Sequence, residues 1–430
     1  MPTTQPNLTI STSPARATRP AASHRSGWRG GVVLAALWLA TALALPAQAA
    51  PPAAASAEPP PNLDARAIVI MDYARGEVLF ERNADLPIPP ASLTKLMTLH
   101  LMYEAIAAGR FRRDTIVPIL PEDVNLPYGS ALMYLQAGMN VPVLDLMLGL
   151  AVISGNDAAR ATARFMSGSI TDFAALMNAA AAEIGLTQTH FEEPSGLSAQ
   201  NISTARDLAV FSRYYLKRHP EAIREIHNVY TMEFPRADIM PPGVPPPAGK
   251  ILLRNRNHLI FDYEGCDGLK TGYIDESGYN IIVTAERDGT RFIVVSLGGK
   301  NGTAARSQTA ASLLDWAFRR WQTVNVPAPA LPALRIWDYA GKFSVPVIDD
   351  SLVFTLDRTD AAMLHSRLVF ETDLRAPLAA GVKVGSLILS AGERVIRRLD
   401  IVTAVDIPRG NFFIRLRDAL TRFWNRLFQP

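Results

Sequence analysis

Cysteine is almost absent from the sequence: Cys266 is the single one in 430 residues, so no intrachain disulfide can form. A long chain without disulfides is held by its hydrophobic core, and 48% hydrophobic residues are enough to build one. No histidine or asparagine arrangement around Cys266 indicates activation, which favours a core-filling side chain over a nucleophile. The length exceeds one ordinary domain and predicts two folded units.

Spacings typical of metal sites are also missing. The seven histidines show no His-x-His or His-Glu-x-x-His pattern, and Cys/His pairs are absent. Because zinc ligands ordinarily show such spacings, we predict no dedicated transition-metal site.

Acidic residues are absent from residues 1–30, which carry four arginines and lead into an apolar run at residues 31–45. A run of fifteen residues is short for a membrane-spanning helix, which needs about 20, and the small-x-small sequence Ala47-Gln48-Ala49 follows it. This pattern is typical of a signal peptide at residues 1–49, cleaved after Ala49, with a transmembrane anchor as the alternative. We therefore expect an exported protein.

Without that segment the chain has no excess of positive charge. Removing its four arginines from the 43 basic residues leaves 39 against 40 acidic ones, a formal net charge of −1. The basic isoelectric point of the whole sequence thus gives no reason to expect a nucleic-acid partner.

Residues 50–62 are mostly proline and alanine and indicate an exposed linker. The next segment, residues 63–325, has strand patterns near both ends and helical periodicity between them. The predicted strands cover residues 67–71, 77–80, 279–285 and 291–297. A first helix is predicted to begin at Ser92, and further helices are predicted over residues 143–152, 156–166, 171–184, 205–217 and 304–321. This order predicts an α+β domain with one sheet and a helical subdomain.

A proline-rich break at residues 326–332 precedes short strand patterns that predict a small all-β domain at residues 326–408. Residues 409–430 then have the pattern of an amphipathic helix. Its apolar face carries Phe412, Phe413, Leu416, Leu420, Phe423, Trp424, Leu427 and Phe428, and its opposite face Arg415, Asp418, Arg422 and Arg426. The pattern favours a helix that binds a membrane surface through residues 411–430, with docking on the β domain as the alternative.

Three short strings carry the chemistry, and the first is Ser92-Leu93-Thr94-Lys95. Residues three apart share a helix face, so the Lys95 amine can reach the Ser92 hydroxyl. A serine becomes nucleophilic when a base takes its proton, and lysine serves as that base when burial or nearby cations lower its pKa. Ser-x-x-Lys alone is a weak signal, because it also arises by chance in a chain of this length.

The second string, Ser154-Gly155-Asn156, lies between two predicted helices, where a hydroxyl and a carboxamide can project into a cleft. There Ser154 can relay a proton and Asn156 can bind a substrate amide, although the string alone is an ordinary helix cap. The third string, Lys270-Thr271-Gly272, precedes a predicted strand and offers positive charge, a hydroxyl and close backbone approach. Alone, it is a solvated strand end.

In this order, on a helix start, a loop and a strand, the strings are similar to those of penicillin-binding proteins and serine β-lactamases. Within that group the chain resembles the low-molecular-mass D-alanyl-D-alanine carboxypeptidases over about residues 63–325. The β domain and tail resemble the rest of the membrane-anchored members. The strings that carry the resemblance cover residues 90–98, 129–133, 154–158, 203–207 and 267–272.

The resemblance implies a role for each residue of the first two strings. Ser92 is expected to be acylated by the penultimate D-alanine of a peptidoglycan stem peptide, with Lys95 as general base. Backbone N–H groups of Ser92 and Tyr273 would form the oxyanion hole. Ser154 would pass a proton to the departing D-alanine, and Asn156 would hold the substrate backbone.

By the same resemblance, Lys270 and Thr271 would bind the terminal carboxylate with help from Arg306, and Gly272 would let the substrate lie close to the strand. Water would hydrolyse the acyl-enzyme without a cofactor. β-Lactam antibiotics are then expected as covalent inhibitors, and the protein is expected at the periplasmic face of the inner membrane.

Two features depart from the family pattern. Tyr273-Ile274 follows Lys-Thr-Gly where many relatives have His-Thr or Tyr-Thr, so one hydroxyl is missing. Residues 232–250 are unusually proline-rich and predict a longer, stiffer loop.

Three other functions compete with the carboxypeptidase. A D,D-endopeptidase would cleave peptide cross-links with the same machinery, although the β domain and tail argue against it. A β-lactamase is disfavoured because no glutamate can be named as its deacylating base. A non-catalytic cell-wall-binding protein that retains the fold is disfavoured by the intact Ser92, Lys95 and Lys270.

Overall fold

The computed structural model describes residues 59–428 except 61, 246–247 and 349. The predicted signal peptide and nearly all of the predicted linker lie outside these residues. Among the residues described, no helix has both the length and the apolar character needed to cross a membrane.

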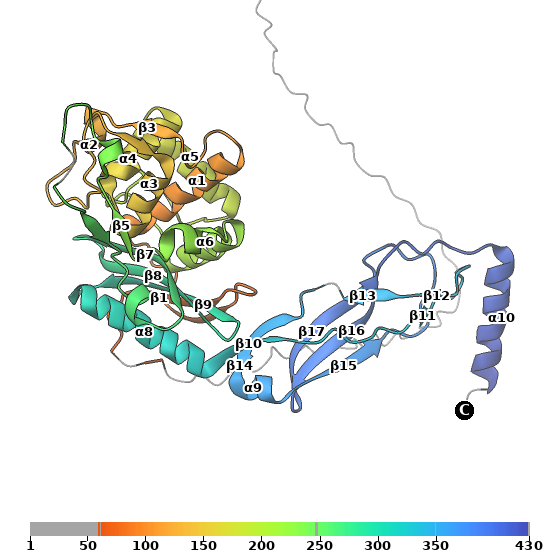
Figure 1. Cartoon of the computed structure of the whole chain (residues 1–430). Helices are drawn as coiled ribbons and strands as arrows, with labels where there is room; N and C mark the ends of the chain where they lie inside the picture. The colour runs from red at the N-terminus through yellow and green to blue at the C-terminus, as the bar shows by residue number, and fades with distance from the viewer. Residues whose placement is uncertain (1–58, 61, 246–247, 349, 429–430) are drawn as a thin grey trace, which may run out of the picture. The chain divides into compact units, whose positions relative to one another are not determined.

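One antiparallel sheet organises the first folded part (Figure 1). Its strands run in the order β2-β1-β9-β8-β7, with β1 at Ala67–Asp72, β2 at Val78–Arg82, β7 at Cys266–Ile274, β8 at Gly278–Arg287 and β9 at Thr290–Gly299. The first and last strands of the domain therefore share one sheet, as the sequence predicts. β7 is an edge strand, so one of its sides has no strand partner in this sheet.

The two faces of the sheet bury different cores, because successive side chains of a strand point to opposite faces. Ile68 and Ile70 of β1 join a core with α8 (Gly302–Arg320). Val69 and Met71, one residue along, join the larger core of the helical subdomain. Cys266 is buried against the α8 core, in the core-filling role predicted for it.

The helical subdomain consists mainly of α1 (Lys95–Ala107), α3 (Val143–Leu148), α4 (Asn156–Ser167), α5 (Ile170–Ile184) and α6 (Ala205–Arg218). Shorter elements are η1 (Ala91–Thr94), β3 (Ile116–Pro118), α2 (Pro121–Val124), β4 (Asn140–Pro142), η2 (Gly149–Ile153) and η3 (Ile223–His227). Thr204 caps α6, because its side chain accepts a hydrogen bond from the Asp207 N–H at 3.1 Å.

Two predicted helices differ locally from the structure. One difference lies at the first string and the other directly before the second string. Ser92 lies in the 3₁₀ turn η1, and the α-helix begins at Lys95. The helix predicted over residues 143–152 ends as α3, and the π-helical turn η2 follows it. Both irregular turns carry the chain into conformations that a regular helix does not allow.

The proline-rich segment before β7 connects the two strands of a small hairpin, β5 (Thr231–Glu233) and β6 (Leu252–Arg254). The short helix η4 (Ala237–Ile239) lies between these strands in the sequence. The short helix α7 (Leu259–Asp262) then leads into β7. Asp288 and Gly289 form the hairpin turn between β8 and β9, with positive φ at both residues (49° and 72°).

The second folded part is mainly β. Its four-stranded sheet has the order β13-β17-β16-β15, and two short pairs, β10-β14 and β11-β12, lie outside that sheet. The strands are β10 (Trp321–Asn325), β11 (Leu334–Arg335), β12 (Phe343–Ser344), β13 (Pro346–Ile348), β14 (Val353–Asp357), β15 (Leu364–Phe370), β16 (Lys383–Ala391) and β17 (Arg394–Thr403). The helices are α9 (Arg358–Ala362) and the terminal α10 (Phe412–Phe428).

Candidate active site

Ser92 lies where three segments distant in sequence approach one another. A Cβ atom on Gly272 of β7 would lie 2.9 Å from Pro90 O and 3.0 Å from Ser92 N. A Cβ atom on Gly196 would lie 1.8 Å from Ala91 O. Because real side chains do not approach backbone this closely, only glycine at both positions lets β7 and the 190s loop touch the nucleophile's own peptide.

The Lys95 amine is placed to act on the Ser92 hydroxyl. Lys95 is fully buried, and its Nζ donates to Ser92 Oγ at 3.0 Å, Asn156 Oδ1 at 2.6 Å and Ser195 O at 2.5 Å. Burial lowers the pKa of Lys95 from its ordinary value near 10.5 to about 7. A large fraction of the amine is therefore neutral at physiological pH and available as a base.

Ser154 and Asn156 bring the second string into the same site. Ser154 has left-handed backbone angles (φ 64°, ψ 36°) directly after the π-helical turn η2, a conformation that is uncommon for a residue with a side chain. Its buried Oγ has no hydrogen-bond partner among the described residues, while Asn156 accepts from Lys95. The strained turn thus holds a buried hydroxyl without satisfying it.

Asp157 fixes the loop opposite these residues. Its carboxylate accepts backbone N–H groups from Met133 at 2.8 Å and Leu135 at 3.0 Å, and Asn156 N donates to Ala131 O at 2.8 Å. These bonds tie the start of α4 to the 129–135 loop, which forms one wall of the cleft. The second string is therefore anchored to this wall by a backbone hydrogen bond as well as by the Asp157 side chain.

The third string lies on the edge strand β7. Lys270 is buried, and its Nζ donates to Thr271 O at 2.9 Å. Burial lowers the pKa of Lys270 well below its ordinary value, and the nearby charges of Lys95, Arg256 and Arg306 lower it further. The guanidiniums of Arg256 and Arg306 and the two buried amines converge on one region, where a bound anion would favour the charged form of each group.

Arg306 supports this interpretation. It projects from α8, is 7% exposed, and its Nε has no hydrogen-bond partner among the described residues. Burial lowers the pKa of its guanidinium to about 10. A buried and incompletely paired guanidinium is expected to bind a carboxylate.

A cleft of about 380 Å³ lies over this region, and neither Lys95 nor Lys270 is among the residues that line it. It is lined by Ser92, Gly129, Ser130, Ala131, Ser154, Asn156, Gly196, Leu197, Arg256, His258, Thr271, Gly272, Tyr273, Ile274, Tyr279, Thr303 and Arg306. None of the described residues of the proline-rich 232–250 segment is among this lining. Tyr273 stands at the rim, 48% exposed, with its ring 4.4 Å from that of Tyr279.

Sequence reasoning missed the loop that holds the Lys95 acceptor in place. Glu193 accepts hydrogen bonds from the N–H groups of Ser195 at 2.8 Å and Gly196 at 2.5 Å and from the amide of Asn201 at 3.0 Å. It thereby fixes the Ser195 carbonyl that Lys95 contacts. An acid followed by Pro-Ser-Gly is a turn signal, which was the available clue.

Arg256 was also missed. Its Nε donates to Ile153 O at 2.8 Å, immediately before Ser154, and its side chain lines the cleft. The buried asparagines on either side, Asn255 and Asn257, hold this segment by hydrogen bonds to His227 O, Val229 O and Gly268 O. Alternating polar residues of this kind resemble an ordinary polar strand in sequence.

Known proteins share this arrangement over most of the chain. The family model of D-alanyl-D-alanine carboxypeptidases matches residues 53–301. D-alanyl-D-alanine carboxypeptidase DacA of Escherichia coli K12 is 32% identical, across 86% of this chain and 90% of its own. The crystal structure of penicillin binding protein 5 from Haemophilus influenzae superposes with a TM-score of 0.72 at 28% identity, across 82% of this chain and all of that one.

Two further relatives bear on specificity and inhibition. A D-alanyl-D-alanine endopeptidase of Pseudomonas aeruginosa is 30% identical, across 69% of this chain and 91% of its own. Penicillin-binding protein D2 from Listeria monocytogenes, in a cefotaxime-bound form, has a TM-score of 0.53 at 30% identity, across 61% of this chain and all of its own.

The contact between Gly196 and the nucleophile's peptide can be tested with a matched pair of alanine variants. Gly196 and Gly168 both have positive φ (81° and 83°), but a Cβ atom on Gly168 meets nothing within 4 Å. Gly168→Ala should cost about 1–2 kcal/mol of unfolding free energy from backbone strain alone. Gly196→Ala should cost more and also slow acylation of Ser92 by a fluorescent penicillin at least about tenfold, since it displaces that residue's peptide. Equal acylation rates in the two variants would contradict the proposed contact.

Proposed function

Since the chain belongs to the D-alanyl-D-alanine carboxypeptidase family of serine hydrolases, we propose that Ser92 is the residue that is acylated when it removes the terminal D-alanine of a peptidoglycan stem pentapeptide. The observation that carries this proposal is the 3.0 Å hydrogen bond from the buried Lys95 amine to Ser92 Oγ. This bond joins the Ser92 hydroxyl, which lies where the three segments meet, to a base of suitable pKa.

The reaction follows from this geometry. Lys95 Nζ takes the Ser92 proton as Oγ attacks the carbonyl carbon of the penultimate D-alanine, and the N–H groups of Ser92 and Tyr273 stabilise the oxyanion. The C–N bond to the terminal D-alanine then breaks as Ser154 Oγ passes its proton to the departing amine and takes a proton from the Lys95 ammonium, which returns to the neutral amine. Water finally attacks the ester and regenerates Ser92. The unsatisfied Ser154 hydroxyl supports its role, since such a group is available to both Lys95 and the leaving nitrogen.

Recognition of a free C-terminus is assigned to the cationic end of the cleft. Lys270, Thr271 and Arg306 bind the terminal carboxylate, whose negative charge offsets the repulsion among the buried cations there. The substrate backbone extends along the open edge of β7, and Asn156 holds a substrate amide. β-Lactams would acylate Ser92 in the same cleft, as the cefotaxime-bound relative suggests.

The endopeptidase remains the second candidate because its machinery is the same. The lengths of the relatives favour the carboxypeptidase: the curated carboxypeptidase aligns with 86% of this chain, and the endopeptidase with 69%. The carboxylate site favours it too, because a free terminal carboxylate defines a carboxypeptidase substrate.

Attachment to a membrane surface through residues 411–430 is part of the proposal, and the orientation of α10 supports it. Asp418 is fully buried and accepts hydrogen bonds from Asp338 N at 2.8 Å and Arg335 Nη2 at 3.2 Å. Arg422 lies 3.8 Å from Asp338 and from Asp373. The polar face of α10 therefore contacts the β domain, which leaves the apolar face outward.

That outward face is large and aromatic. Its exposed side chains are Phe412, Phe413, Leu416, Leu420, Phe423, Trp424 and Leu427. A soluble terminal helix would bury this face, whereas a helix in a membrane interface exposes it to lipid. We therefore place the enzyme, after export, at the periplasmic surface of the inner membrane.

The function is tested by D-alanine release from a purified stem pentapeptide. The wild type should release D-alanine, and Ser92→Ala should release none and bind no labelled penicillin. A cross-linked peptide dimer is the matched substrate: cleavage of the dimer in preference to the pentapeptide would establish the endopeptidase instead. Persistent penicillin labelling of Ser92→Ala would remove Ser92 from the mechanism.

The low pKa of Lys95 predicts the pH dependence of acylation. The neutral amine is the base, so kcat/KM should rise with pH, reach half its plateau near pH 7 and fall about tenfold for each pH unit below that. Histidine ordinarily titrates in this range as well, and His258 lines the cleft. The midpoint should persist in His258→Gln; its disappearance there would assign the base to His258.

The orientation of α10 predicts which substitutions release the protein from lipid. Leu420→Ser combined with Trp424→Ser should weaken the affinity for anionic vesicles, measured by sedimentation, about 100-fold or more. Each apolar side chain buried in lipid contributes about 1.5–3 kcal/mol. Deleting residues 411–430 should abolish it. Leu252→Ser, an equally exposed site on β6, is the control and should sediment like the wild type. Unchanged sedimentation of the deletion variant would contradict the anchor.

A further inference from the structure

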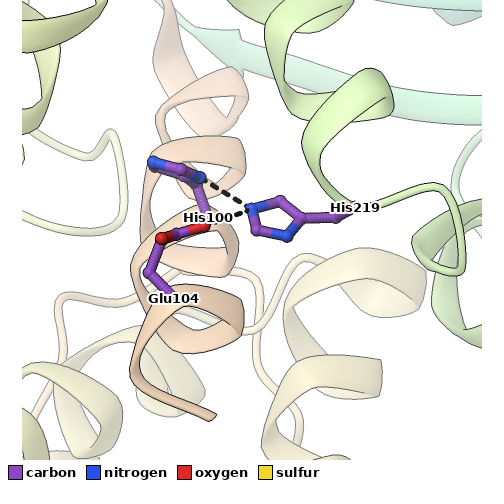
Figure 2. Close-up of side chains that lie close together, drawn as sticks. All are labelled: His100, Glu104 and His219. Carbon is purple, nitrogen blue, oxygen red and sulfur yellow. Dashed lines mark hydrogen bonds and ion pairs between the residues drawn. The ribbon is translucent and has the colours of Figure 1, made fainter. Parts of the chain in front are cut away.

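A histidine pair and a glutamate lie together outside the active-site cleft (Figure 2). His100 and Glu104 project from one face of α1, and His219 follows the last residue of α6. The two imidazoles are almost completely buried, and His100 Nδ1 lies 2.8 Å from His219 Nε2. Glu104 Oε1 lies 3.5 Å from the same His219 nitrogen.

His100 Nδ1, His219 Nε2 and a Glu104 carboxylate oxygen are ligand atoms of the kinds that bind a divalent transition metal. All of them lie within 4.8 Å of one another. Zinc binds histidine nitrogen and carboxylate oxygen at about 2.0–2.1 Å in a tetrahedron, whose ligand atoms are then about 3.3 Å apart. The separation from His219 to Glu104 already fits this value, and the histidine nitrogens need to part by only about half an ångström.

The surrounding side chains hold the two rings ready for a metal. The ring of Tyr103 stacks on His219 with centroids 4.9 Å apart, and Phe211 and Tyr214 contact the His100 ring edge-on. Imidazoles whose orientation is fixed by their neighbours are well suited to bind a metal.

We propose that His100 Nδ1, His219 Nε2 and a Glu104 carboxylate oxygen form a zinc site that ties α1 to the end of α6. The metal takes the place of the proton between the two histidines, and the histidine that carries this proton moves it to its other ring nitrogen, so no net proton is lost. Water or Glu221 completes the coordination, because a hollow beside His219 and Glu104 is also lined by Glu221.

Arg218 is the competitor of the metal. Its Nε and Nη2 donate to the two Glu104 carboxylate oxygens at 2.7 and 2.9 Å, and its side chain is 52% exposed. An exposed ion pair of this kind contributes little stability, so Arg218 can turn into solvent when metal binds. Because Arg218 and the metal compete for Glu104, removing Arg218 should strengthen metal binding. A histidine pair with only a structural role would show no such effect.

The sequence offered one weak sign of this site. His100 and Glu104 have the i, i+4 spacing that places two ligands on one helix face, but His219 is distant in sequence. The absence of the common zinc spacings therefore led us to expect no metal site. Our proposal departs from that expectation.

The test uses tag-free protein without residues 1–49, dialysed against Zn²⁺ with Mg²⁺ and Ca²⁺ in excess. One zinc should be retained per molecule, and Co²⁺ in its place should give the visible absorption of a four-coordinate site. His100→Gln and His219→Gln should each weaken zinc binding by about 100-fold or more. Arg218→Ala should tighten it. Zinc should also raise the melting temperature of the wild type and leave that of the two histidine variants unchanged.

His190→Gln is the control, since His190 is exposed and also lies near a carboxylate, Glu192 at 4.0 Å. Its zinc affinity should equal that of the wild type. Circular dichroism of each variant confirms that it is folded. Retention of zinc in both folded histidine variants, loss of zinc in His190→Gln, or no zinc in the wild type would each overturn the proposal, whatever the peptidase activity proves to be.

Discussion

The burial of one amine organises this active site. Lys95 has no exposed surface, and three oxygen acceptors from three segments surround its Nζ: Ser92 Oγ, Asn156 Oδ1 and Ser195 O. Removal from water disfavours the ammonium form, while the negative charges of Glu193 and Asp157 favour it. The balance leaves the pKa close to neutrality, which a fully solvated or fully unpaired lysine would not have. Each acceptor is fixed in turn by its own segment: η1, the start of α4 and the Glu193 loop.

The sequence predicted much of this site because the chemistry depends on short strings. Ser92, Lys95, Ser154, Asn156, Thr271 and Arg306 all converge as expected, and the helices and strands around them lie close to their predicted ranges. Strings of this kind can be recognised in a sequence because their residues have defined chemical roles. The α+β class followed from the order of periodicities, and the similarity to known carboxypeptidases confirms it.

The remaining features depend on contacts between residues distant in sequence, which periodicity does not reveal. Helical periodicity at residues 143–152 did not reveal the π-helical turn that gives Ser154 its left-handed backbone. Gly272 was expected to make room for substrate, but its clearest role is to admit η1 against β7. Arg256 and Glu193 acquire their importance only when the chain folds and places them beside Ile153 and Ser195. The pairing of His100 with His219 is of the same kind.

The isolation of Cys266 has a practical consequence. Its thiol is 6% exposed at the start of β7, and burial raises its pKa to about 12, so very little reactive thiolate is present at neutral pH. The fold therefore matures without an oxidant and cannot be scrambled by one. A cysteine introduced elsewhere on the surface would be the one accessible thiol among the described residues, which makes this chain a convenient scaffold for attaching a spectroscopic probe near the cleft or along α10.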